Sequence, residues 1–91
     1  CHNDKALKNI ERAIKLAESE SPRNDARVAK YYDQRGHILV EQNRLSEAVQ
    51  SFETALVYLY GIVQPQDKLI TGITHNYTLV KEQLDKRSEH C

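Results

Sequence analysis

The 91-residue sequence has little of what forms tight turns or disulfide frameworks. It contains three glycines, two prolines, one phenylalanine and neither methionine nor tryptophan. Its two cysteines are the first and last residues, so no disulfide staples the interior and the core must hold by packing alone. The length is enough for one domain and not two. What is abundant is Ala, Leu, Glu, Lys, Gln and Arg, a composition typical of helices.

An excess of charge of one sign is also missing. Thirteen Lys and Arg balance thirteen Asp and Glu. Nucleic acids and anionic membranes bind surfaces with a basic excess, so this balance argues against both as main partners. The longest apolar runs, such as residues 55–60, are far shorter than the roughly 20 residues of a membrane-spanning helix. We therefore expect no nucleic-acid partner and no membrane span.

The ends of the chain leave several interpretations open. There is no initiator Met and no signal-peptide pattern, so we expect a processed product or an excised domain, and the cytoplasm is the favoured compartment. Cys1 also leaves open the lipid anchor of a bacterial lipoprotein. Cys1, His2, His90 and Cys91 are possible zinc ligands, or the two cysteines pair. Ordering such ends costs chain entropy, so we assign them no function and expect no metal site.

Six apolar residues recur 42 positions apart. They are Ala6, Leu7, Ile10, Ala13, Ile14 and Ala17 in the first copy, and Ala48, Val49, Phe52, Ala55, Leu56 and Leu59 in the second. Helical periodicity explains the spacing within each copy, but it does not explain the shared order of small and large residues. Glu11 and Glu53 match as well. The chain therefore contains an internal 42-residue repeat, which is typical of solenoids built from helix pairs.

Turn-forming residues divide the chain into four expected helices. Ser21-Pro22 and Gln64-Pro65 end the first and third, because proline disfavours helical geometry in the residue before it. Asp67 opens the fourth. We expect an all-α fold in which residues 1–91 form a single helical domain. Its four antiparallel helices are expected near residues 4–20, 25–42, 47–63 and 67–87.

The short loops carry their own signals. Asn24 and Asp25 are good caps for the second helix, and Asn43 is suited to the left-handed conformation that closes it. Ser46 is the expected cap of the third helix. These residues predict helix-turn-helix connections of only a few residues.

Residues 43–56 have the sequence Asn-Arg-Leu-Ser-Glu-Ala-Val-Gln-Ser-Phe-Glu-Thr-Ala-Leu, and Gly36 lies twelve residues before Ala48. This pattern resembles the tetratricopeptide repeat (TPR), whose helix pairs carry small residues at Gly36, Ala48 and Ala55 and a large ring at Phe52. Gly36 would let two helices approach closely, and Phe52 would fill the space between them. The 42-residue spacing exceeds the family's usual 34 and is similar to the longer-helix form found in kinesin light chains. The resemblance implies a right-handed superhelix fragment of about two units.

The resemblance is strong only over residues 32–56, and the sequence departs from the family pattern at two places. Arg35 stands where the family prefers an apolar residue, and Tyr77 or Thr78 stands where Gly36 would repeat. The fourth helix is therefore either a divergent first helix of a unit or a solvating cap. A second family, the microtubule-interacting-and-transport (MIT) domain, is also similar over residues 28–87 and binds short helical motifs between its helices. The 42-residue repeat favours the first family.

The polar residues show no catalytic pattern. The sequence has no Gly-rich phosphate loop, no His or Cys pair at metal-ligand spacing on a helix and no nucleophile elbow. We expect a protein that is not an enzyme and has no cofactor. The TPR resemblance implies a scaffold or adaptor that binds a protein, peptide or partner helix on the face lined by the second and fourth helices. The candidate partner-binding residues on that face are Lys30, Asp33, Gln34, His37, Glu41, His75, Asn76 and Gln83.

Four of the five tyrosines, together with Ile62, fall into two groups. Tyr32 and Tyr77 lie on apolar stripes and are expected in the core. Tyr58, Tyr60 and Ile62 lie off the main stripe and make the expected third helix apolar almost all round. Either neighbouring helices cover these three residues, or they form an apolar interface with another repeat or with a second copy in a homo-oligomer.

Overall fold

The computed structural model describes residues 2–64 and 66–90, and within them the chain forms four α-helices. These are α1 (His2–Ser19), α2 (Asp25–Glu41), α3 (Leu45–Leu59) and α4 (Lys68–His90). In the part of the chain so described there is no β-strand, only an isolated bridge between Tyr60 and Val63. The predicted all-α, four-helix fold is confirmed.

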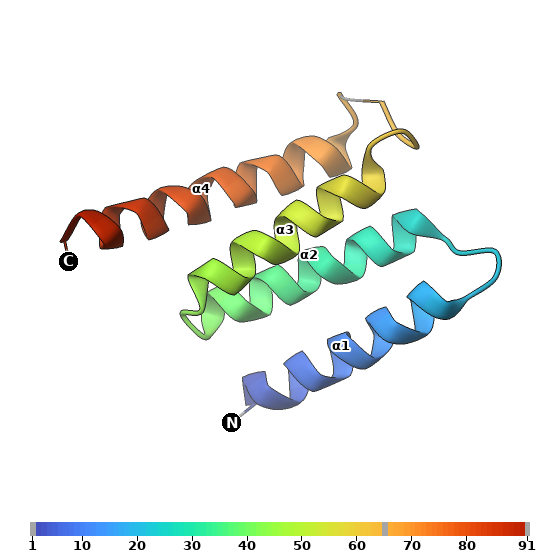
Figure 1. The fold of residues 1–91 in the computed structure, drawn as a ribbon, viewed down its shortest axis with the longest axis horizontal. Helices are drawn as coiled ribbons and strands as arrows, with labels where there is room; N and C mark the ends of the chain where they lie inside the picture. The colour runs from blue at the N-terminus through green and yellow to red at the C-terminus, as the bar shows by residue number, and fades with distance from the viewer. Residues whose placement is uncertain (1, 65, 91) are drawn as a thin grey trace.

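The helices form an open array in chain order. Each packs mainly against the next one along the chain, and consecutive helices run antiparallel, with α1 and α4 at the two edges (Figure 1). α1 and α3 therefore run in the same direction. The molecule measures 46 × 34 × 16 Å along its principal axes, so it is thin in one dimension. Such an array leaves more helix surface uncovered than a closed bundle of the same length.

The turn between α2 and α3 has the conformation that its sequence predicts. Asn43 has φ of 64°, the left-handed conformation that its sequence position predicts. The Asn43 N–H donates to the Val40 carbonyl and the Arg44 N–H to the Leu39 carbonyl, each at 2.9 Å. At the other end of α2, the side-chain oxygen of Asn24 accepts from the Arg27 N–H at 3.1 Å. Both caps of α2 are thus built by the asparagines that the sequence singles out.

The bounds predicted for the third helix differ most from the structure. α3 begins at Leu45, and Ser46 lies inside its first turn rather than capping it. Leu45 is buried, which favours starting the helix there. α3 ends at Leu59 instead of near residue 63, because Tyr60 is extended and Gly61 has φ of 91°. The turn then closes by the Ile62 N–H donating to the Leu59 carbonyl at 3.1 Å.

The 42-residue repeat has a structural counterpart. In the first copy, Leu7, Ile10, Ile14 and Ala17 are buried, as are their counterparts Val49, Phe52, Leu56 and Leu59 in α3. The remaining pairs join half-buried alanines of α1 to fully buried Ala48 and Ala55. Equivalent residues of α1 and α3 therefore occupy the same helical face, and the core runs along the array.

Gly36 marks the closest approach between α2 and α3. A Cβ atom built there would lie 2.6 Å from Cε1 of Phe52, a separation at which the ring or the helix would have to move. Phe52, Ala48 and Ala55 are all fully buried around this contact. Tyr32 and Tyr77, the expected core tyrosines, are half-buried and pack against the same core.

Candidate functional site

The structure places the eight predicted partner-binding residues on the outer parts of α2 and α4. Asp33 and Asn76 are half-buried, whereas the other six are exposed: Lys30, Gln34, His37, Glu41, His75 and Gln83. We call these eight residues the α2/α4 surface. A side-chain contact between His37 and Asn76, which are 39 positions apart, joins its two helices.

Asp33, His37 and Asn76 are brought together into one cluster. The His37 Nε2 atom lies 3.5 Å from Oδ1 of Asp33, one helical turn earlier, and 3.3 Å from Nδ2 of Asn76. The His37 ring also stands edge-on to Phe52, with ring centroids 5.4 Å apart. Burial of the Asp33 carboxyl raises its pKa, and this effect is opposed by His37 and by hydrogen bonding from Asn76. The cluster is a polar link between α2 and α4.

The predicted apolar interface is divided by the fold. Tyr58 faces inward: its hydroxyl donates to Oε2 of Glu18 at 2.7 Å, and its ring stacks on that of Tyr32 with centroids 5.9 Å apart. Tyr60 and Ile62 follow α3 and are 64% and 50% exposed. They border a hollow of about 580 Å³ that Asp67 also lines. Only the latter two residues of the predicted interface are therefore open to solvent.

Glu18 is the acceptor at a junction of three helices. Its Oε2 atom accepts from the Tyr32 hydroxyl at 2.9 Å as well as from Tyr58, so it links α1 to both α2 and α3. Burial, followed by the hydrogen bond to Glu18, raises the pKa of Tyr32 to about 12. The hydrogen bond to Glu18 is the main cause of the raised pKa of Tyr58. No local sequence pattern indicates this junction, because the two tyrosines lie 14 and 40 positions from Glu18.

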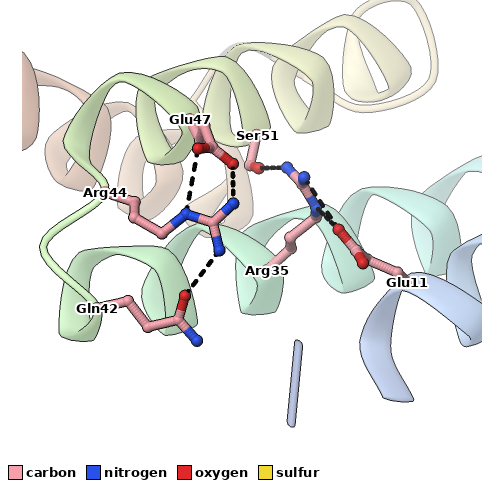
Figure 2. Close-up of polar contacts among 6 residues, drawn as sticks. All are labelled: Glu11, Arg35, Gln42, Arg44, Glu47 and Ser51. Carbon is pink, nitrogen blue, oxygen red and sulfur yellow. Dashed lines mark hydrogen bonds and ion pairs between the residues drawn. The ribbon is translucent and has the colours of Figure 1, made fainter. Parts of the chain in front are cut away.

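Arg35 forms a second three-helix link, shown in Figure 2. Its Nε and Nη2 atoms each lie 3.1 Å from Oε2 of Glu11 in α1, and its Nη1 donates to Oγ of Ser51 in α3 at 2.5 Å. Ser51 is buried, so the guanidinium satisfies a hydroxyl that water does not reach. The apparent departure from the TPR pattern at Arg35 is therefore a structural contact between helices.

A groove lies beside these two links, between α1 and α2. It encloses about 710 Å³, and its lining residues are Lys8, Glu11, Arg12, Ile14, Lys15, Glu18, Tyr32 and Arg35. None of them belongs to the α2/α4 surface. The sequence signal that marks this groove is the spacing of Lys8, Arg12 and Lys15, which places three cations along one side of a helix.

Comparison with protein-family models, curated proteins and solved structures returned no match. Among the described residues, no helix has the length and apolarity to cross a membrane. Nor do the described side chains gather three or more His, Cys, Asp or Glu in a group that could hold a metal ion. The candidate ligands at Cys1, His2, His90 and Cys91 lie outside the side chains that the structure describes.

Proposed function

We propose that the chain is a non-enzymatic protein-interaction module of TPR-like architecture, a scaffold or adaptor that binds a peptide or partner helix on the α2/α4 surface. One observation carries the proposal: α1 lies in the same direction as α3 and buries the equivalent face of the same 42-residue unit (Figure 1). This arrangement favours stacked helix pairs over an MIT-like bundle crossed by an extra helix. In a stack of such pairs, α2 and α4 are equivalent helices whose outer faces form one surface.

The chemistry of the α2/α4 surface suits a polar peptide backbone with mixed side chains. Gln34 and Gln83 each carry an amide that both donates and accepts hydrogen bonds. Lys30 and Glu41 supply one charge of each sign at opposite ends of α2. The polar link through His37 and Asn76 holds the two helices together beneath a docked segment. The energy of binding would come from several such contacts on a pre-formed surface.

The proposal is tested by selecting peptides from a random display library against the full chain and measuring their affinity for matched variants. The variant Lys30→Ala/Gln34→Ala/Gln83→Ala removes three exposed side chains of the surface. The control Gln50→Ala/Glu53→Ala changes exposed residues of α3. We expect the first variant to weaken binding by at least tenfold and the control by less than twofold. Equal effects of the two variants, or no peptide enriched above background, would exclude the proposed surface.

Self-association is a second candidate function, favoured by exposed apolar residues in the last turn of α3 and directly after it. Val57 is 68% exposed and lies one helical turn before Tyr60, which is followed by exposed Ile62. Sedimentation equilibrium over a hundredfold range of concentration tests it. A mass that rises with concentration in the wild type and stays monomeric in Tyr60→Glu would support an interface there. A constant monomer mass in both would rule it out.

A further inference from the structure

We propose that the groove between α1 and α2 is a second docking site, which takes an acidic peptide segment along the cations Lys8, Arg12 and Lys15. This site goes beyond the α2/α4 surface and does not depend on it, since the groove shares no residue with that surface. The inference rests on three features: the charges in the groove, the partners that those charges have, and the spacing of the cations.

The groove is positive in a chain whose charges otherwise balance. Four cationic side chains and two carboxylates line it, while the whole sequence has thirteen of each sign. Both carboxylates are already engaged inside the protein. Glu11 pairs with Arg35, and Glu18 accepts hydrogen bonds from two tyrosines. The charge of Glu11 is therefore balanced by Arg35, which leaves Lys8, Arg12 and Lys15 against the single carboxylate of Glu18.

Lys8, Arg12 and Lys15 are exposed. The described side chains provide none of these three cations with an ion-pair partner. By contrast, Arg35 and Arg44 each pair with a carboxylate, at 3.1 and 2.6 Å respectively (Figure 2). Unpaired cations beside a groove attract a partner of opposite charge and steer its approach.

The spacing of the cations fits separate carboxylates better than a continuous polyanion. Lys8 and Lys15 lie seven residues apart on a helix, which corresponds to about 10 Å at 1.5 Å per residue. Acidic side chains three residues apart on a peptide in the polyproline II conformation lie on one face and span about 9 Å. The carboxylate of Glu18 also lines the groove, where it would repel the closely spaced phosphates of a nucleic acid. An acidic peptide segment can place its charges to avoid Glu18.

The test uses fluorescence anisotropy of a labelled twelve-residue peptide with Glu at every third position, and the same peptide with Gln in place of Glu. The groove variant is Lys8→Glu/Arg12→Glu/Lys15→Glu. The matched control, Lys68→Glu/Lys81→Glu/Lys86→Glu, makes the same change in net charge at exposed residues of α4 outside both the groove and the α2/α4 surface. We expect the acidic peptide to bind the wild type and the control within a factor of two, and the groove variant at least tenfold more weakly. Added salt should weaken binding in each case.

Three results would overturn the inference: equal binding of the acidic and Gln peptides, equal loss in the two variants, or tighter binding of a single-stranded oligonucleotide of the same charge. The neutral variant Lys8→Gln/Arg12→Gln/Lys15→Gln keeps the test decisive if charge reversal disturbs folding, and circular dichroism reports whether each variant is helical. Both variants leave the α2/α4 surface unchanged, so loss of acidic-peptide binding in the groove variant alone reports on the groove and not on that surface.

Discussion

At the scale of single residues, Gly36 determines how closely α2 and α3 can pack. Gly36 lies against the ring of Phe52, and a Cβ atom at Gly36 would collide with that ring. Gly72, in α4, has no atom near its own Cβ position. Replacement by alanine is therefore expected to change the free energy of unfolding in opposite directions at the two glycines.

Gly36→Ala is expected to lower the free energy of unfolding by about 1–3 kcal/mol, the usual cost of overpacking a core. Gly72→Ala is expected to raise it by about 0.5–1 kcal/mol, because alanine favours the helix and meets no obstacle. Urea denaturation followed by circular dichroism measures both. A Gly36→Ala protein as stable as the wild type would show that α2 and α3 are not so closely packed.

The raised pKa of Tyr32 gives a second residue-scale prediction. An unfolded tyrosine ionises near its ordinary value of 10.0, whereas Tyr32 in the folded protein keeps its proton until about pH 12. Between these values the folded state binds more protons than the unfolded state, so stability should fall as the pH rises. Ultraviolet titration should show that Tyr32 and Tyr58 ionise later than an unfolded tyrosine, with Tyr32 near pH 12.

The variant Glu18→Gln separates the causes of that pKa. Removing the carboxylate should lower the pKa of Tyr32 only in part, because burial is the larger cause and remains. The pKa of Tyr58 should fall as well, since its hydrogen bond to Glu18 is the main cause of its shift. Glu41→Gln, at an exposed site, is the control. A Tyr32 pKa unchanged by Glu18→Gln would contradict the three-helix junction.

At the scale of helices, the sequence predicted their number and order but not all their ends or contacts. Proline and asparagine act locally, which is why the ends of α1 and α2 lie within two residues of the predicted ones. The end of α3 depends on the backbone of Tyr60 and Gly61, and neither residue type forces a helix to stop. The link through Arg35 joins residues 16 and 24 positions away, so no local pattern contains it.

Arg35→Met is expected to lower the free energy of unfolding by about 1–3 kcal/mol, because it leaves the buried hydroxyl of Ser51 without its partner. The loss should appear first as faster amide hydrogen exchange in α1, since Arg35 also holds Glu11 of that helix. Arg12→Met, at an exposed and unpaired cation, should change stability by less than about 0.5 kcal/mol. Equal exchange in α1 for the two variants would argue against the link.

At the scale of the whole molecule, α4 at one edge of the array differs from α2, the helix that stands 42 residues before it. In α2, Ala29, Gly36 and Leu39 are buried. The residues 42 positions later in α4 are Thr71, Thr78 and Lys81, all exposed. A helix packed on α4 as α3 packs on α2 would bury a charge and two hydroxyls, which is unfavourable without partners. Of the two roles that the sequence left open for the fourth helix, this polar face favours the solvating cap.

The α2/α4 surface and the groove between α1 and α2 differ in how far the sequence alone locates them. Helical periodicity separates inner from outer faces, so the exposed residues of the α2/α4 surface could be named in advance. The groove beside α1 could be located only in part, because the spacing of Lys8, Arg12 and Lys15 marks a row of cations but does not show which carboxylates the fold pairs. Recognition of the free cations needed the contacts of Arg35, Tyr32 and Tyr58 with α1.

The most direct test of the proposed function is a two-dimensional ¹H–¹⁵N NMR titration of the full chain with a display-selected peptide. The account predicts that the amide and side-chain signals that move at saturation cluster on the α2/α4 surface, including the Asn76 side-chain amide and the residues flanking His37. Signals of α3 around Gln50 should stay in place. A saturable titration that leaves the signals of α2 and α4 unmoved would contradict the account.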